Sequence, residues 1–386
     1  MTEHQKTATL LTHVSANPEK YDGVVNVPVH RASTIVFKTY EDYTAKPLPP
    51  FVYGRCGTPS SAAFEQAISA LEGAAGSVTT CSGLSAIVTA ITAFAGSGDH
   101  ALIPDNVYGP NRNFCQKMLS NCGVEVEFYD PLTSDIGKQF RKNTKVLFIE
   151  APGSLTFEVC DIGAFVKAAK AANVTTVMDN SWGSPLLFKP LEHGIDVSVM
   201  SCTKYISGHS DAMLGVVSGT EETYHKVKAT AMALGICAGS EELYIGLRGL
   251  RTLHVRLKEH ESRGLEMARW LEKQPAVKRV LYPPLPGCPG HENWKKYFKG
   301  ACSTFSIVLH ESDKGKYARM LNGLKLFRMG ASWGGYESLC LPDQPSASRT
   351  ATQWTEKGLL LRMHVGFEDI EDLKSDLSEG FKRLAG

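Results

Sequence analysis

The chain has 386 residues, more than one simple hydrophobic core accommodates, and this length predicts two domains. Its 41 basic and 40 acidic residues nearly cancel, which argues against a protein that binds nucleic acid or an anionic membrane surface. The first twenty residues lack the apolar core of a signal peptide, and no apolar run is long enough to span a bilayer. We therefore expect a soluble, cytoplasmic protein.

The predicted elements begin after an irregular N-terminal arm, residues 1–55, which ends in a proline-rich passage. From residue 56 to about residue 220, β-type and α-type patterns alternate. The β-type runs lie at residues 77–80, 100–104, 145–152, 174–181, 196–204 and 213–219, and the α-type runs at 85–95, 111–123 and 161–173. This alternation is typical of an α/β domain with a mostly parallel central sheet that helices cover on both faces.

The pattern changes beyond about residue 220. One long helical stretch, residues 240–274, carries leucines and aromatic residues at helical spacing. Two further strands are predicted at 302–310 and 359–366, and two further helices at 316–324 and 370–385. We therefore expect a smaller α+β domain, residues 249–386, packed on a larger domain, residues 56–248.

Cysteine and histidine are the residues to test for a metal site. The ten cysteines form no C-x-x-C pair and no zinc-like Cys/His spacing, so we expect buried or free thiols. Cys202 is expected to pack in the interior, because nothing near it resembles a Cys/His nucleophile pair. His209, His291 and His364 lack paired ligands and are predicted to be neutral structural histidines, with no metal site.

Chemically useful side chains come directly after several of the β-type runs. In an open parallel sheet, ligands bind outside the carboxyl ends of the strands. The positions that follow the runs hold Ser82, Gly83, Tyr108, Asp179 and Lys204. These residues are therefore predicted to surround one binding site.

Lys204, in the stretch SVMSCTKYISGHSD, is the most informative of these residues. Within a buried strand, desolvation of its charge would cost free energy. At the carboxyl end of the strand, beside Ser201 and Thr203, it can present its amine to a ligand. Gly83 opens a predicted helix, and a helix N-terminus with a nearby hydroxyl binds phosphate. Asp179 ends an apolar strand and needs a buried cationic partner. Tyr108 offers a ring that can stack on a flat ligand.

Pyridoxal 5′-phosphate (PLP) has an aldehyde, a phosphate, a flat ring and a ring nitrogen that requires an acid. A lysine Schiff base and an acidic partner for the ring nitrogen are the pattern of enzymes that use it. Each residue alone has an ordinary structural interpretation, such as a solvated loop lysine or a helix cap. Their joint occurrence at strand ends favours PLP.

The stretch SCTKYISGHSDAMLGVV resembles the lysine signature of the PLP-dependent enzymes of cysteine and methionine metabolism. The similarity extends over essentially the whole chain and includes FVYGRCGTPS, VYGPNRNF, EAPGSLTFEV, MDNSW and LLLRMHVGFED. It implies the aspartate-aminotransferase type of fold (fold type I). Within the family, YPPLPGCPGHENWKKYF and SWGGYESL are most similar to the bacterial cystathionine β-lyases.

The resemblance implies roles in cofactor binding. Lys204 would form the Schiff base and later transfer protons, Asp179 would pair with the ring nitrogen, and Tyr108 would stack on the ring as a second catalytic residue. The residues implied to bind the phosphate are Gly83, Leu84, Ser201 and Thr203, with Tyr53 and Arg55 reaching the phosphate of an adjacent subunit. The implied assembly is a dimer with shared sites, paired into a tetramer.

The resemblance also implies a substrate site and a reaction. Arg362 would bind the α-carboxylate of an amino-acid thioether, helped by Ser332 and Trp333. The reaction would be α,β-elimination of L-cystathionine to homocysteine, pyruvate and ammonia, a step of methionine biosynthesis. Ala331 stands where these lyases often carry a tyrosine. This leaves open β-elimination from cysteine or other S-substituted cysteines, and γ-elimination or γ-replacement, although Trp333 favours β-elimination.

Two other classes of function are less consistent with the sequence. The string SCTK matches the S-x-x-K motif of penicillin-recognising serine enzymes, but the chain lacks their S-D-N and K-T-G strings. A non-enzymatic protein on the same fold would be expected to have lost some of the site residues, and none is lost.

Overall fold

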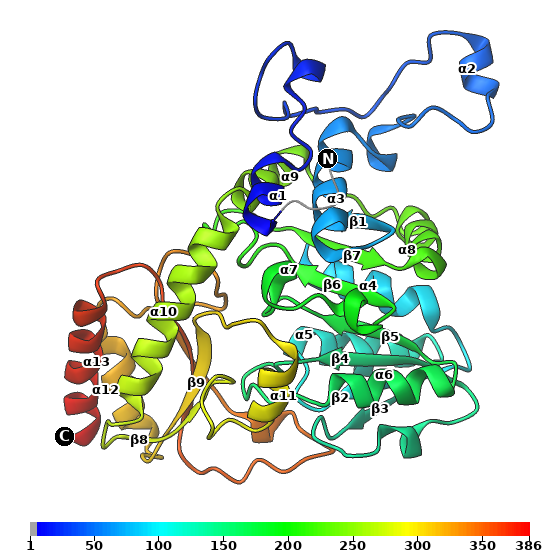
Figure 1. Cartoon of the computed structure of the whole chain (residues 1–386). Helices are drawn as coiled ribbons and strands as arrows, with labels where there is room; N and C mark the ends of the chain where they lie inside the picture. The colour runs from blue at the N-terminus through cyan, green and yellow to red at the C-terminus, as the bar shows by residue number, and fades with distance from the viewer. Residues whose placement is uncertain (1–5) are drawn as a thin grey trace.

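The computed structural model describes residues 6–386 as two β-sheets with helices packed on them (Figure 1). The larger sheet has seven strands in the order β1-β7-β6-β5-β4-β2-β3. They are β1 (Gly76–Thr80), β7 (Gly215–Gly219), β6 (Val197–Ser201), β5 (Thr175–Asp179), β4 (Thr144–Glu150), β2 (His100–Pro104) and β3 (Glu125–Tyr129). Only β7 is antiparallel to its neighbours, so the predicted α/β fold with a mostly parallel sheet is confirmed.

Helices cover both faces of this sheet, and the strands contribute side chains to both cores. In β4, Leu147 and Ile149 belong to one hydrophobic core, and Val146 and Phe148 belong to the other. The first core includes side chains of α3 (Pro59–Glu72), α6 (Ile162–Ala171) and α9 (Ser240–Leu250), and the second those of α4 (Gly83–Phe94) and α8 (Glu221–Ala233). The central strands are consequently apolar along most of their length.

The second sheet is antiparallel, with the order β10-β11-β9-β8. Its strands are β10 (Leu339–Asp343), β11 (Leu360–His364), β9 (Thr304–Leu309) and β8 (Val277–Leu281). The helices beside it are α10 (Leu253–Leu271), α12 (Lys314–Gly323) and α13 (Ile370–Ala385). Leu373, Leu377 and Leu384 lie on one face of α13 and are buried. The smaller α+β unit expected near the C-terminus is therefore present.

The prediction of one continuous helix over residues 240–274 is wrong. The structure divides it into α9 and α10 at Arg251 and Thr252. The Arg251 guanidinium donates hydrogen bonds to the carbonyls of Leu11 (2.8 Å) and Val14 (2.9 Å), which tie the break to the N-terminal helix α1 (Thr7–His13). Contacts with a distant segment are not visible in a local periodicity, so the sequence pattern did not reveal the break.

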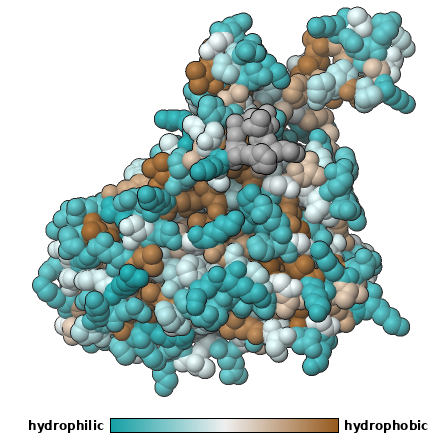
Figure 2. Space-filling model, in the orientation of Figure 1, coloured by the Kyte–Doolittle hydropathy of each residue, from teal (hydrophilic) through white to brown (hydrophobic). Residues whose placement is uncertain are grey.

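The segment between α1 and α3 extends away from the body of the molecule, with α2 (Tyr40–Thr44) at its far end (Figure 1). Several large apolar side chains on it are exposed, among them Val36, Tyr40 and Tyr43. Figure 2 shows hydrophobic residues on this projecting part of the chain. The short helices elsewhere are α5 (Gly109–Asn113), α7 (Ser184–Leu187) and α11 (His291–Tyr297).

Two further expectations concern membrane segments and cysteines. Within residues 6–386, no helix is both long enough and apolar enough to cross a membrane. All ten cysteines are free, and Cys202 is fully buried, as expected.

Glu72, the last residue of α3, is a fully buried carboxylate. Within the described part of the chain, neither of its carboxylate oxygens has a hydrogen-bond partner. Burial raises the pKa of Glu72 to about 7, although the neighbouring Ser198 and Asn180 side chains and the charge of Lys189 favour the ionised form. The folded protein therefore keeps this proton to a higher pH than the unfolded chain, and stability is lost as the pH rises from about 4.5 to about 7.

Replacing Glu72 with glutamine should remove this pH dependence, because glutamine carries no titratable proton. Relative to the wild type, the free energy of unfolding of Glu72→Gln should increase by about 2–3 kcal/mol between pH 5 and pH 8.5. Urea denaturation at the two pH values measures the change. Glu272→Gln, at an exposed carboxylate, is the control and should show no such difference. An equal pH dependence in Glu72→Gln and wild type would contradict the assignment.

Candidate active site

The carboxyl ends of β2, β4, β5 and β6 lie at one edge of the larger sheet, and the segments that follow them surround a cavity of about 420 Å³. Twelve residues predicted to form the site line it: Ser82, Gly83, Leu84, Tyr108, Asp179, Ser201, Thr203, Lys204, Ala331, Ser332, Trp333 and Arg362. The first eight lie at the ends of strands of the larger sheet or in the segments that follow them, and the last four come from the C-terminal part of the chain. The structure therefore brings together residues that are far apart in the sequence.

Lys204 lies in the turn that follows β6. Its ammonium donates a hydrogen bond of 2.8 Å to the Ser332 hydroxyl and lies 5.3 Å from the centre of the Trp333 ring. Burial and the positive charge of Arg362 lower the pKa of Lys204 to about 8, against the opposing effect of Asp179. The amine is therefore neutral in a larger fraction of molecules than a free lysine, which is what a nucleophile or a base requires.

Asp179 ends β5 and lies opposite Glu150, the last residue of the neighbouring strand β4. Burial raises the pKa of Asp179, although Ser181 donates a backbone hydrogen bond of 2.9 Å to its carboxylate. Burial and the charge of Asp179 raise the pKa of Glu150 well above its usual value. Two adjacent buried carboxyls do not both ionise readily, so this edge of the cavity favours a cationic ligand group beside Asp179.

Tyr108 precedes α5, and its backbone N–H donates a hydrogen bond of 2.8 Å to the Glu150 carboxylate. Its side chain lines the cavity and is 40% exposed. Burial and the negative charges of Asp179 and Glu150 raise the pKa of Tyr108, so it stays an uncharged phenol. A neutral ring at the open side of the cavity is suited to stacking on a flat ligand.

Glu150 was not among the site residues predicted from the sequence. The signal was available, because VLFIE is an apolar strand that ends in a carboxylate, as TTVMD is for Asp179. Glu150 lines the same cavity and joins the Tyr108 segment to the end of β4.

The start of α4 forms the opposite side of the cavity. The Ser82 hydroxyl accepts a hydrogen bond from the Ser85 N–H at 3.1 Å and caps the helix. Gly83 lies against Ser201, and a Cβ at Gly83 would be 2.5 Å from the Ser201 Cβ. Such a helix N-terminus beside a serine hydroxyl is an anion-binding arrangement. Thr203 supports it indirectly, because its hydroxyl accepts from the Leu214 N–H (2.9 Å) and donates to the Leu214 carbonyl (3.2 Å).

Arg362 reaches the cavity from β11 of the smaller sheet. Its guanidinium donates hydrogen bonds to the carbonyls of Gly330 (3.3 Å) and Ser332 (3.2 Å). These bonds orient the side chain and leave its positive charge without a carboxylate partner among the described residues that line the cavity. A carboxylate ligand suits this position.

An amine, a buried acid and an anion-binding helix start are the three groups that PLP requires, and all three line this one cavity. Lys204 can condense with the aldehyde, and Asp179 can hold the ring nitrogen in its protonated form. The helix start at Gly83 can bind the phosphate. The residues therefore fit the predicted cofactor.

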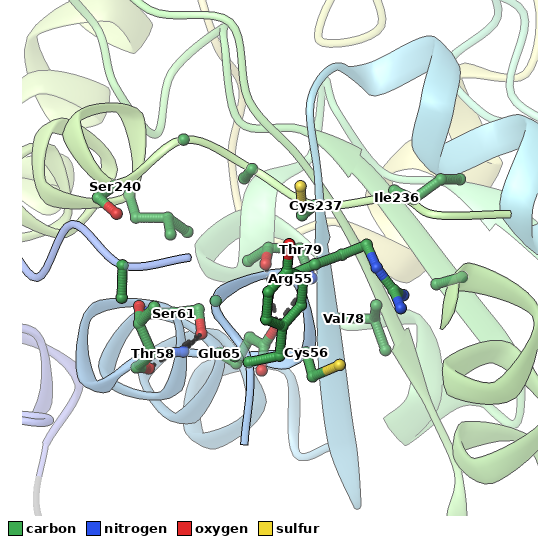
Figure 3. A pocket seen from close by; sticks show the side chains of 18 of the residues that line it. Arg55, Cys56, Thr58, Ser61, Glu65, Val78, Thr79, Ile236, Cys237 and Ser240 are labelled. Carbon is green, nitrogen blue, oxygen red and sulfur yellow. Dashed lines mark hydrogen bonds between the residues drawn. The ribbon is translucent and has the colours of Figure 1, made fainter. Parts of the chain in front are cut away.

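Tyr53 and Arg55 do not lie in this cavity. They line a separate cavity of about 490 Å³, which also includes Cys56 and Cys237 (Figure 3). The Arg55 guanidinium donates a hydrogen bond of 3.1 Å to the Met232 carbonyl. The structure therefore places these two predicted phosphate ligands apart from Lys204 of the same chain.

The three histidines considered for a metal site each contact main-chain groups. His364 is buried and its Nε2 lies 3.0 Å from the Gly335 carbonyl, and burial lowers its pKa to about 4, so it is neutral near pH 7. His209 and His291 pair through Nδ1 with the carbonyls of Ser207 and Pro283. Residues 6–386 contain no cluster of three or more side chains suited to hold a metal ion.

Comparison with known proteins adds independent findings. Residues 8–382 match the family described as Cys/Met metabolism PLP-dependent enzyme. The chain is 40% identical to the cystathionine beta-lyase of Escherichia coli, covering 98% of this chain and 99% of that one, and 41% identical to the L-alanine/L-glutamate racemase of Wolbachia pipientis, covering 98% of each. The crystal structure of cystathionine gamma synthase from Xanthomonas oryzae pv. oryzae is 29% identical, with a TM-score of 0.91 and 99% of each chain covered.

The contact between Gly83 and Ser201 leads to a test of the phosphate site. A methyl group at Gly83 would displace the start of α4 or Ser201, so Gly83→Ala should weaken PLP binding by the purified apoprotein about tenfold or more. Absorbance titration with PLP measures the affinity. Gly287→Ala is the control, because a Cβ at Gly287 meets no atom within 4 Å. Equal affinities for the two variants would contradict the assignment.

Proposed function

Because the chain belongs to the family of PLP-dependent enzymes of cysteine and methionine metabolism, we propose that it is a carbon–sulfur β-lyase. Its proposed reaction is the α,β-elimination of L-cystathionine to homocysteine, pyruvate and ammonia. The observation that carries the proposal is one cavity in which the Lys204 amine, the Asp179 carboxyl and the Arg362 guanidinium come together. The cofactor is PLP.

The residues proposed to hold PLP are Lys204, Asp179, Tyr108, Gly83, Leu84, Ser201 and Thr203. When bound, PLP supplies an aldehyde that condenses with amines and a ring that accepts the electron pair released at Cα. Asp179 would keep the ring nitrogen protonated, and burial and the charge of Asp179 raise the pKa of the adjacent Glu150, which favours its neutral form. Tyr108 would stack on the ring.

Lys204 is proposed to move the protons. A pKa of about 8 allows its amine to take the Cα proton of the substrate, since a neutral fraction is present near pH 7. The Cβ–S bond then breaks, and the sulfur leaves with its electron pair and takes a proton from Lys204. Water hydrolyses the remaining three-carbon unit to pyruvate and ammonia.

Arg362 is proposed to bind the substrate α-carboxylate. Its orientation by the Gly330 and Ser332 carbonyls supports this role, because a fixed guanidinium places the substrate Cα at a defined distance from Lys204. Ser332 and Trp333 enclose the same end of the cavity. The small side chain of Ala331 leaves space beside them for the leaving group.

Product analysis with L-cystathionine tests the reaction. Incubation of the PLP-loaded protein should yield pyruvate and homocysteine in equal amounts. Oxobutyrate with cysteine would instead establish γ-cleavage. D-amino acids formed from L-alanine or L-glutamate would indicate racemisation, the activity named for the Wolbachia relative. Pyruvate formed from other cysteine thioethers, without cleavage of cystathionine, would support α,β-elimination but with a different substrate.

Replacing Lys204 tests its role separately. Lys204→Ala should abolish turnover, a loss of at least about 10³-fold, because no other described lysine lines the cavity to accept and return the proton. The thermal midpoint should remain near the wild-type value. Lys167→Ala, at an exposed lysine, is the matched control and should retain full activity. Near-normal turnover in Lys204→Ala would rule out this mechanism.

We also propose that the active sites are shared in a dimer, with Tyr53 and Arg55 binding the PLP phosphate of the neighbouring subunit, and that dimers pair into tetramers. The position of both residues outside the Lys204 cavity of their own chain supports this.

Subunit mixing tests the shared site. Lys204→Ala and Arg55→Ala homo-oligomers should both be impaired, but refolding them together should form hybrid dimers with one intact site each. Activity should then rise above the sum of the two separate preparations. No gain on mixing, with hybrids verified by mass spectrometry, would place each site within a single chain.

A further inference from the structure

A segment of the smaller unit crosses to the larger sheet beside the active site. Residues 344–359 connect β10 to β11, the strand that carries Arg362. Within this connection, residues 349–352, here called the strap, contact two segments that follow strands of the larger sheet. Both segments contribute to the wall of the Lys204 cavity.

Asp105, which follows β2, is the first attachment point, and its side chain is fully buried. One carboxylate oxygen accepts the Thr350 N–H (2.9 Å), and the other accepts the N–H groups of Ala351 (3.0 Å) and Thr352 (2.7 Å) and the Thr352 hydroxyl (2.7 Å). Burial alone would raise the pKa of Asp105, but the hydrogen bonds from Thr350, Thr352 and Arg112 outweigh it and lower that pKa. The carboxylate is therefore ionised and accepts the hydrogen bonds that the strap donates.

Asp105 is also connected to Tyr108. Arg112, nearly fully buried in α5, forms an ion pair with the Asp105 carboxylate and donates to the Asp105 carbonyl at 3.0 Å. The Arg112 N–H donates to the Tyr108 carbonyl at 3.0 Å. The contacts between Asp105 and Arg112 therefore close residues 105–112 into a loop, and Tyr108 lies within this loop.

Arg349 forms the second attachment. Its guanidinium donates to the Glu158 carboxylate at 2.8 Å, and both side chains are more than nine-tenths buried. It also donates to the Thr156 hydroxyl. Gly153 and Leu155, in the same segment after β4, line the cavity. The strap therefore holds two walls of the cavity to the unit that carries Arg362.

We propose that Asp105 is a positioning residue: by binding the strap, it fixes the Tyr108 ring over the cofactor and sets the spacing between the two units of the active site. The inference rests on the proposed role of Tyr108 in cofactor stacking, but it does not depend on which substrate is cleaved. Loosening the strap should disturb the bound cofactor even when no substrate is present.

The test compares PLP-loaded wild type with Asp105→Asn, which replaces one acceptor oxygen by a donor that faces the strap N–H groups. We expect backbone hydrogen exchange in residues 350–352 to be at least about tenfold faster, because these amides lose their buried partner. The visible circular dichroism of bound PLP should fall, and PLP should dissociate about tenfold faster. Asp130→Asn, at an exposed aspartate after β3, is the matched control.

Two milder variants keep the proposal testable if Asp105→Asn does not fold. Thr352→Val removes one strap hydroxyl and should change exchange and cofactor dichroism in the same direction, whereas Thr352→Ser retains the hydroxyl and should restore both. Faster hydrogen exchange in residues 350–352, with unchanged PLP dichroism and an unchanged PLP dissociation rate, would overturn the proposal. The strap would then connect the two units without positioning Tyr108. Equal effects in Asp130→Asn would overturn it as well. If the wild type cleaves a different thioether, the cofactor measurements still test the role of Asp105, because they are made without substrate.

Discussion

The central strands of the seven-stranded sheet are buried on both faces, and this constraint determines where the protein can place charge. A charged side chain within such a strand would lose its hydration without gaining a partner. The charged groups of the site therefore lie at the ends of strands, and parallel strands bring their carboxyl ends to the same edge. Glu150, Asp179 and Lys204 lie at or just beyond that edge because the interior of the sheet excludes them.

Among the described residues, the charged side chains that line the cavity lack partners of opposite charge that a ligand could supply. Burial raises the pKa of both Glu150 and Asp179, the charge of Asp179 raises that of Glu150 further, and Arg362 disfavours the charged form of Lys204. A ligand that carries a protonated ring nitrogen and a phosphate supplies a cation beside Asp179 and an anion at the start of α4. The proposed cofactor would therefore stabilise the site, and the positive charge of Arg362, together with burial, would make Lys204 available as the proposed base.

The smaller unit completes the site and fixes its dimensions. Arg362, Ser332 and Trp333 reach the cavity from that unit, so the distance between the Arg362 guanidinium and Lys204 depends on how the two units are held together. Hydrogen bonds from the strap to the buried Asp105 carboxylate and the buried Arg349–Glu158 ion pair hold them at points next to the cavity wall. Because a buried carboxylate that loses its donors is costly, these contacts specify one arrangement of the units more strongly than apolar packing alone.

Local sequence signals predicted the α/β fold and most of the residues that line the cavity, because strand ends and helix starts are local features: an apolar run followed by Lys204 or Asp179, and a Ser-Gly pair before a helix. They did not reveal Glu150 as the partner of Asp179, since that pairing depends on which strand lies next to β5. Nor did they reveal the division of residues 240–274 into two helices or the binding of the strap by Asp105. These features depend on the tertiary structure, because contacts between segments that are distant in the sequence leave no trace in local periodicity.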